Sequence, residues 1–227
     1  VGRELSSVWS DETRARMREG FERTEHAVWA PAFDGAASSL DAFVDRWSGL
    51  AEETCRLEHS ENRPSGVLLT RRKTCLEFAR VDLESAIEAL VQPSFKLVEE
   101  REAVLPSSQQ LELCASDQLL LTALAPPPPP HKREAVVELL RRLQRVKQAR
   151  LGIDPPSALP LAKAVVADAL ALDHAPTEAE ALATLGAVQI DAQHSQLALE
   201  AFEASVLAAD RGGADLLRGL SLQKVGR

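Results

Sequence analysis

The sequence predicts an all-α protein, and two features indicate this. Aromatic residues make up only 4% of the 227 residues and tyrosine is absent, so Ala and Leu must build most of the interior. Packed helices use such residues, whereas strands favour β-branched and aromatic ones. Apolar residues also recur at the three- and four-residue spacing that aligns side chains on one face of a helix. We therefore expect antiparallel helical hairpins or a helical bundle.

Several local signals define helices in the first half. Ser10, followed by two acidic residues, predicts an N-cap, because its hydroxyl can accept from the first free backbone N–H groups. Ser38, with Asp41 three residues later, predicts the start of the next helix. That helix carries an apolar stripe in which Trp47 is expected to belong to the core.

A third helix is expected after the break at residues 61–66, because its leucines stand seven residues apart. It ends at Pro93. Shorter helices are predicted over residues 94–105 and 116–124. Near the start of the third helix, Arg71 and Arg72 are expected to pair with acids of the neighbouring helix, such as Glu52 or Glu53.

Five consecutive prolines mark the clearest boundary. They favour an extended polyproline helix, which makes a stiff spacer or, alternatively, a ligand for an aromatic-lined groove. The predicted organisation is a helical bundle over residues 1–125, a spacer over 126–130 and a second helical region over 131–227.

The helix after the spacer has an apolar stripe and a basic face. The basic residues are Arg141, Arg142, Arg145, Lys147 and Arg150. This face either meets an acidic partner or is solvated.

The last third contains a repeat that resembles the tetratricopeptide repeat, a helix pair in which a small residue admits a large one from the facing helix. The residues that carry the resemblance are Leu182, Leu185, Gly186, Ala198, Phe202 and Ser205. Gln189 and Asp210 depart from the family pattern, which usually has an aromatic residue and often a proline there.

A second copy stands at an offset of 40 residues. Its residues Ala158, Leu159, Ala162, Val165 and Val166 align with Ala198, Leu199, Phe202, Ser205 and Val206. Asp215–Val225 is expected to open a third repeat, so the array is expected to be truncated at Arg227. Such an α-solenoid binds peptides or proteins along its surface, although the repeats can also be purely structural.

The first half resembles the region after the membrane helix in many myxobacterial serine/threonine protein kinases. The residues that carry this resemblance are Leu5, Ser6, Ser7, Val8, Trp9, Ser10, Asp11, Trp47, Thr54, Cys55, Ser65, Gly66, Val67, Leu68, Leu69, Cys75, Leu76, Leu113, Cys114 and Ala115. In that family a kinase domain, a membrane helix, a helical region and tetratricopeptide-like repeats follow one another.

The resemblance implies a kinase domain upstream of Val1 and a membrane anchor in the parent protein. The chain itself matches no glycine-rich phosphate loop, catalytic loop or Asp-Phe-Gly motif, so we expect no enzyme activity, no catalytic residues and no cofactor. The implied location is extracytoplasmic, in the periplasm, with the cytoplasm as the alternative.

Three cysteines bear on the compartment. Cys55 and Cys75 lie about equally far from Ser65, so two antiparallel helices would bring them to one level, where a disulfide and two reduced buried thiols are both compatible with the spacing. The extracytoplasmic location implied by the resemblance favours the disulfide. Cys114 is left over, with a partner expected upstream of Val1.

Metal and catalytic sites have little support. Cys55, His59 and Cys75 offer three zinc ligands without a fourth, and a solvated His59 is the alternative. The remaining histidines, His26, His131, His174 and His194, stand at no catalytic spacing. We expect no metal ion.

The composition limits the partners. A net charge of −8 argues against nucleic acid, whose phosphates bind surplus Lys and Arg, and no apolar run approaches the roughly 20 residues that span a bilayer. Two hypotheses follow. The first is a sensor or interaction region of a transmembrane kinase that binds a peptide, protein or small ligand and so regulates the upstream kinase domain. The second is a cytoplasmic adaptor whose repeats collect proteins. A membrane helix encoded just upstream distinguishes them. A helical enzyme would need a deep polar pocket with converging titratable groups.

Overall fold

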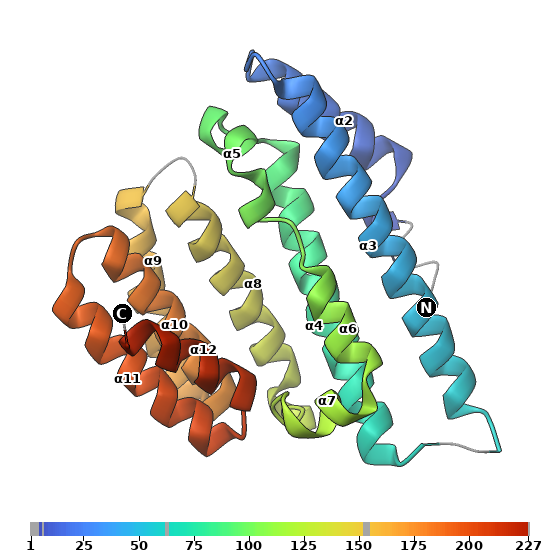
Figure 1. Ribbon diagram of the computed structural model, residues 1–227, viewed down its shortest axis with the longest axis vertical. Helices are drawn as coiled ribbons and strands as arrows, with labels where there is room; N and C mark the ends of the chain where they lie inside the picture. The colour runs from blue at the N-terminus through green and yellow to red at the C-terminus, as the bar shows by residue number, and fades with distance from the viewer. Residues whose placement is uncertain (1–4, 6, 62–63, 152–154, 227) are drawn as a thin grey trace. The chain divides into compact units, whose positions relative to one another are not determined.

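The computed structural model describes residues 5, 7–61, 64–151 and 155–226, and it confirms the all-α prediction, since no strand occurs among them (Figure 1). The chain divides into two compact units, Val1–Leu120 and Leu121–Arg227. The division falls five residues before the predicted end of the first domain at residue 125. None of the helices in the described ranges is long and apolar enough to cross a membrane.

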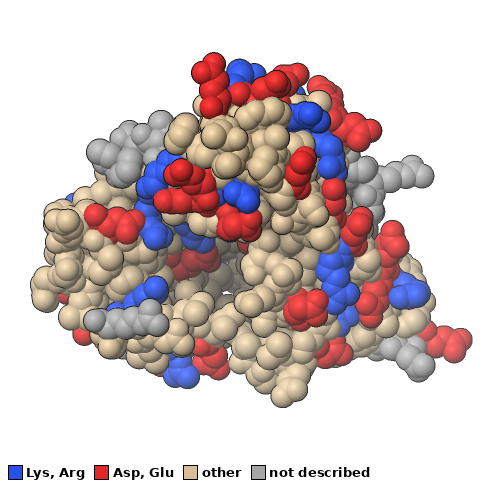
Figure 2. All heavy atoms as spheres, turned by 45° about the horizontal axis from the view of Figure 1, so that its top comes forward, with Lys and Arg blue, Asp and Glu red and all other residues tan. Residues whose placement is uncertain are grey.

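Charges of both signs alternate over the surface. On the face shown in Figure 2, Lys and Arg side chains lie beside Asp and Glu side chains. Ion pairs occur in both units: Arg46 lies 3.1 Å from Glu112, and Arg142 lies 2.6 Å from Asp168. Cations paired in this way offer little surplus positive charge to a phosphate backbone.

The first unit is built from three long helices and several short ones. They are α2 (Asp11–Arg23), α3 (Trp29–Glu58), α4 (Gly66–Val91), α5 (Phe95–Glu99), the 3-10 turn η1 (Arg101–Ala103), α6 (Ser108–Ala115) and α7 (Asp117–Thr122), the last of which crosses the boundary between the units. Helix α2 packs against α3 and α4, and α4 also packs against α6.

Serine caps begin several of these helices. As predicted, Ser10 caps α2, where its Oγ accepts from the backbone N–H of Thr13 at 3.2 Å. The predicted start at Ser38 is wrong, because α3 begins at Trp29 and runs through that position. The buried side chains of Phe33 and Ala36 pack the helical turns that precede Ser38 into the core. The hydroxyl of Ser39 donates to the carbonyl of Gly35 one turn earlier, as serines inside helices do.

The predicted helix over residues 94–105 is shorter than expected and α6 was not predicted. Glu100 interrupts the first segment, leaving α5 and η1 in place of one helix. Helix α6 lies in a stretch with few apolar residues, of which Leu111 and Cys114 are fully buried. Its position matters for the cysteines, as described below.

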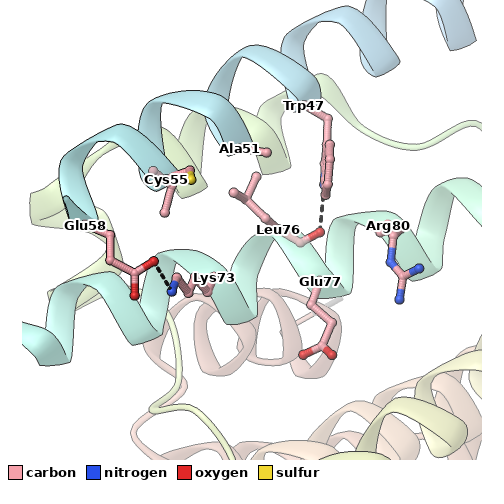
Figure 3. A pocket seen from close by; sticks show the side chains of 9 residues that line it. Trp47, Ala51, Cys55, Glu58, Lys73, Leu76, Glu77 and Arg80 are labelled. Carbon is pink, nitrogen blue, oxygen red and sulfur yellow. Dashed lines mark hydrogen bonds and ion pairs between the residues drawn. The ribbon is translucent and has the colours of Figure 1, made fainter. Parts of the chain in front are cut away.

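The core of the first unit lies where α2, α3 and α4 meet. Trp47 is buried there as predicted, and its indole Nε1 donates to the carbonyl oxygen of Leu76 at 2.8 Å (Figure 3). Helix α2 approaches the end of α4 so closely that a Cβ atom at Gly20 would lie 2.2 Å from the carbonyl oxygen of Val91. Only glycine fits at that crossing.

The second unit is a run of helices in which each packs against the next. After the 3-10 turn η2 (Pro130–Lys132) come α8 (Arg133–Leu151), α9 (Pro155–Leu172), α10 (Ala175–Asp191), α11 (Ser195–Gly212) and α12 (Asp215–Val225). These helices coincide with the segments that the repeat pattern predicts. Nearest-neighbour packing of this kind is typical of stacked helix pairs.

The segment just before the proline tract packs within the second unit. Ala125 lies against a cluster of small buried residues, Ala179, Ala208, Ala209 and Ala214. The backbone N–H of Leu216 donates to the carbonyl of Ala123 at 3.1 Å, and Pro128 is buried. Pro126, Pro129 and Pro130 are exposed, and the backbone of Pro129 is extended.

Candidate functional site

The residues of the predicted repeat signature come together on α10 and α11. Gly186 faces the ring of Phe202 so closely that a Cβ atom there would lie 2.9 Å from two ring carbons. Ala198 and Ser205 are fully buried on the same helix as Phe202. Leu182 packs against the alanine cluster and Leu185 is partly buried. The small-against-large contact that the pattern predicts is therefore present.

Ser205 joins three helices. Its hydroxyl donates to the carbonyl oxygen of Ala179 on α10 at 2.8 Å. Its oxygen lies 2.9 Å from Oγ of Ser221 on α12, and Ser221 is the donor because the Ser205 proton is already used. Both hydroxyls are buried, so these bonds fix α10, α11 and α12 relative to one another. The sequence pattern selected Ser205 but not Ser221.

The basic face of α8 meets acids of its own unit. Lys147 lies 3.1 Å from Glu180, and Arg150 pairs with Asp191. Both acids belong to α10. Arg142 pairs with Asp168 on α9. The three basic residues are only partly exposed and pair within the unit, whereas Arg145 of the predicted face is exposed.

An apolar stripe on α10 lies beside these ion pairs. Ala183, Ala187 and Ile190 stand three and four residues apart, on the helical face that also carries Glu180. Ile190 is 52% exposed, and the two alanines are partly buried. Because the alanines are small, a partner backbone can approach this stripe closely. We take this surface as the candidate partner site.

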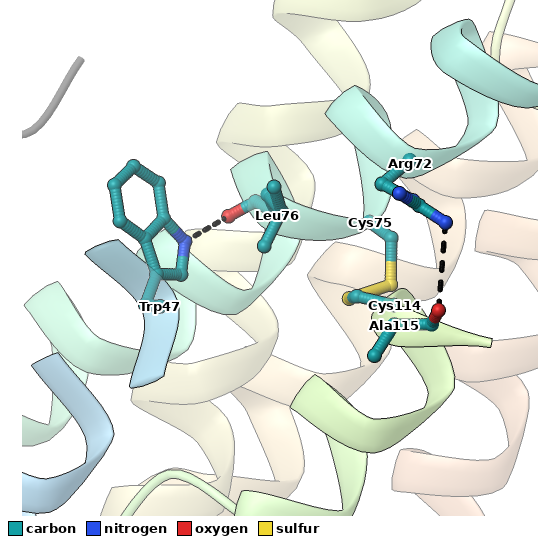
Figure 4. The surroundings of a disulfide bond; sticks show 6 residues. All are labelled: Trp47, Arg72, Cys75, Leu76, Cys114 and Ala115. Atoms are coloured by element: carbon teal, nitrogen blue, oxygen red, sulfur yellow. Dashed lines mark hydrogen bonds between the residues drawn. A yellow bond between two sulfur atoms is a disulfide. The ribbon is translucent and has the colours of Figure 1, made fainter. Parts of the chain in front are cut away.

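The predicted disulfide is wrong. The bond joins Cys75 to Cys114, with 5.6 Å between the Cα atoms, and Cys55 is free and exposed (Figure 4). Cys75 points from α4 toward α6, whereas the adjacent Leu76 receives Trp47 from α3. The pairing of Cys55 with Cys75 was predicted because no helix was expected around Cys114. In the structure α6 carries Cys114 directly against α4.

The pairing predicted for Arg71 and Arg72 is also wrong. Arg71 donates to the carbonyl oxygen of Leu120 at 2.7 Å. Arg72 is only 5% exposed and donates to the carboxylate of Asp117 and, at 3.4 Å, to the carbonyl of Ala115. Arg72 thus binds the C-terminal end of α6, where positive charge is favoured, and the first residue of α7, whereas Arg71 binds a carbonyl within α7.

The structure brings no three-ligand metal site together in the residues it describes. Of the three candidates, Cys75 is engaged in the disulfide, and Nδ1 of His59 bonds to the carbonyl oxygen of Cys55 at 2.8 Å. His26 is buried against Phe95, where its Nδ1 accepts from Val28 and its Nε2 lies 3.3 Å from Glu99. These contacts hold the turn between α2 and α3.

His174 occupies the N-cap position of α10. Its Nδ1 lies 2.7 Å from Oγ1 of Thr177, and Lys132 donates to the carbonyl of the preceding Asp173 at 2.6 Å. Burial, and to a lesser degree the charge of Lys132, lowers the pKa of His174 below its ordinary value of 6.5. The neutral ring is thus the form that suits this turn.

Comparison with known proteins gives no relative. No protein-family model, curated protein or solved structure matches the chain.

Because Gly186 contacts Phe202, replacing Gly186 should destabilise the protein far more than replacing Gly219. Gly186→Val should lower the free energy of unfolding by about 1–3 kcal/mol, because the added methyl groups overlap the buried ring. Gly219→Val, on α12 with open space around it, should change it by less than about 0.5 kcal/mol. Urea unfolding followed by circular dichroism measures both; equal effects would contradict the close contact.

The disulfide predicts a specific loss on removal of one partner. Cys75 and Cys114 are 39 residues apart, and a loop of that length gives a stabilisation of roughly 4 kcal/mol through the unfolded state. Cys114→Ser should therefore lower the melting temperature of the oxidised protein, and Cys55→Ser should leave it unchanged. A comparable loss in Cys55→Ser would show that Cys55 is the bonded residue.

His174 predicts a pH dependence with a defined sign. Because its folded-state pKa is lowered, the unfolded chain binds more protons between that lowered pKa and 6.5, so stability falls as the pH falls through this window. The decrease between pH 7.5 and 5.5 should be smaller in His174→Gln than in the parent. His194→Gln, at the N-cap of α11, is the control and should retain the parental dependence.

Proposed function

We propose that this chain is the non-catalytic sensor and protein-interaction region of a bacterial transmembrane serine/threonine protein kinase. The repeat helices of the second unit bind a peptide or protein partner, and this binding regulates the upstream kinase domain. Two features support the proposal: the order of the sequence motifs that resemble this kinase family, and the locked arrangement of α10, α11 and α12 beside the open stripe on α10.

The locked arrangement is the observation that carries the binding proposal. Phe202 seated on Gly186 and the bond between Ser205 and Ser221 fix the helices before a partner arrives. A surface that is already ordered loses little conformational entropy on binding, so more of the contact energy appears as affinity. Rigid helices also hold a recognition surface more exactly than loops do.

The chemistry of the stripe indicates what kind of partner fits it. Its bordering charges are already paired, Lys147 with Glu180 and Arg150 with Asp191, so a charged partner gains little from them. Ile190 offers apolar contact, and Ala183 and Ala187 leave room beside it. A peptide with an apolar anchor residue is the partner this surface suits best.

The cysteines bear on the compartment. A buried bond between Cys75 and Cys114 supports an extracytoplasmic location, where disulfides persist. The alternative is a cytoplasmic adaptor, and the free, exposed Cys55 favours it, because a leftover thiol is unusual in an oxidising compartment.

Peptide selection tests the proposed function. A random phage-displayed peptide library is panned on the immobilised full chain, and the enriched peptides are measured against variants. Ile190→Asn should lower the affinity of these peptides about 10- to 100-fold, because burying one aliphatic side chain contributes roughly 1.5–3 kcal/mol to binding. Leu207→Asn is the matched control, since Leu207 on α11 is 64% exposed and lies off the stripe.

Either of two results would overturn the proposal. The first is that no peptide is enriched above a blank surface. The second is that enriched peptides bind Ile190→Asn as tightly as the parent chain.

A further inference from the structure

A cavity of about 260 Å³ lies between α3 and α4 in the first unit. Its lining comes from both helices (Figure 3). From α3 come Trp47, Ala51, Thr54, Cys55 and Glu58, and from α4 come Lys73, Leu76, Glu77 and Arg80. The cavity is far from the residues of the repeat signature in sequence and belongs to a different unit.

The space arises from the sizes of the side chains along α3. Trp47, Ala51 and Cys55 stand four residues apart and therefore share one face of the helix. The large indole fills one end of that face, whereas the small Ala51 and Cys55 leave the next two turns open toward α4. A leucine at position 51 would occupy much of this volume.

The floor of the cavity has few polar groups that are free to bind a ligand. Trp47, Ala51, Thr54 and Leu76 are each at most 4% exposed. The indole N–H is used by the Leu76 carbonyl, and the Thr54 hydroxyl donates to the carbonyl of Leu50 at 2.6 Å. With these donors engaged, the floor offers hydrocarbon and aromatic surface to a ligand and few free polar groups.

The rim is charged but balanced. Glu58 and Lys73 are 2.6 Å apart, and Arg80 lies 3.1 Å from Glu84 just beyond the lining. Glu77 completes a rim of two acids and two bases, which gives no net charge. A ligand with a net charge would meet a like charge or disrupt one of these pairs, so charge complementarity favours an uncharged molecule.

We propose that this cavity binds a small uncharged molecule with an aromatic body of about two rings. The volume supports this size, since a dry cavity of ~150 Å³ holds benzene. Trp47 lines the cavity through the small part of it that is not buried, 4% of the residue, and supplies aromatic contact there. The site is separate from the repeat surface and takes a different class of ligand, so it gives the chain a second input.

Cys55 provides a direct test, because its free thiol stands at the edge of the cavity (Figure 3). The full chain is equilibrated with N,N′-di(2-naphthoyl)cystamine or with N,N′-diacetylcystamine in a 2-mercaptoethanol buffer. Both probes are uncharged and form the same kind of mixed disulfide with Cys55, releasing the other half as a thiol. Intact mass gives the labelled fraction, and it also shows whether Cys75 and Cys114 stay linked.

The naphthoyl probe should label Cys55 at least 10-fold more strongly than the acetyl probe. The control chain combines Cys55→Ala with Glu52→Cys, which puts the thiol on an exposed position of the same helix, and there the two probes should label equally. Filling the cavity with Ala51→Leu should remove the preference at Cys55, provided circular dichroism shows unchanged helix content.

Equal preference at positions 55 and 52 would overturn the proposal, as would a preference that survives in Ala51→Leu. If the filled variant loses helix content, saturation transfer NMR with 2-naphthol decides. Saturation transfer from the parent chain to 2-naphthol that falls when the naphthoyl group occupies Cys55 supports the site. An absence of transfer, or transfer that the label does not reduce, refutes it. These results leave the peptide test of the repeat surface unaffected, because every variant lies in the first unit.

Discussion

The bond between Cys75 and Cys114 is the constraint on which the first unit depends. Helices α6 and α7 span only 8 and 6 residues, far below the length at which a helix is stable alone. They are ordered because the disulfide ties α6 to the middle of α4, and because Arg71 and Arg72 bind the carbonyl groups of Leu120 and Ala115. Leu111 and Leu120 complete this attachment as fully buried side chains. Covalent, electrostatic and apolar contacts therefore converge on one short segment.

The second unit obtains its order differently. Each helix packs on its neighbours, and small residues allow close approach, as at Gly186 and at the alanine cluster around Ala208. Two buried hydroxyls, Ser205 and Ser221, replace the covalent link of the first unit. The two units thus differ in the surfaces that they offer: the first has an open cavity between α3 and α4, and the second has the helical stripe on α10.

The features that the sequence could predict are those that follow from helical periodicity. The all-α fold, the cap at Ser10, the buried Trp47 and the contact between Gly186 and Phe202 all follow from spacing and residue size. Helix α6 was missed because its only buried apolar residues are Leu111 and Cys114, so tertiary contacts and not local pattern order it. That omission produced the wrong disulfide partner. The partners of Arg72 were missed for the same reason, because Ala115 ends α6 and Asp117 follows two residues later.

Disulfide mapping of the protein, directed to the bacterial periplasm for the experiment, tests this account most directly. Free thiols are blocked with iodoacetamide as the cells are opened, and the protein is then digested without reductant and analysed by mass spectrometry. The account predicts a linked pair of peptides that contain Cys75 and Cys114, with only Cys55 alkylated. A Cys55–Cys75 link, or alkylation of all three cysteines, would contradict it.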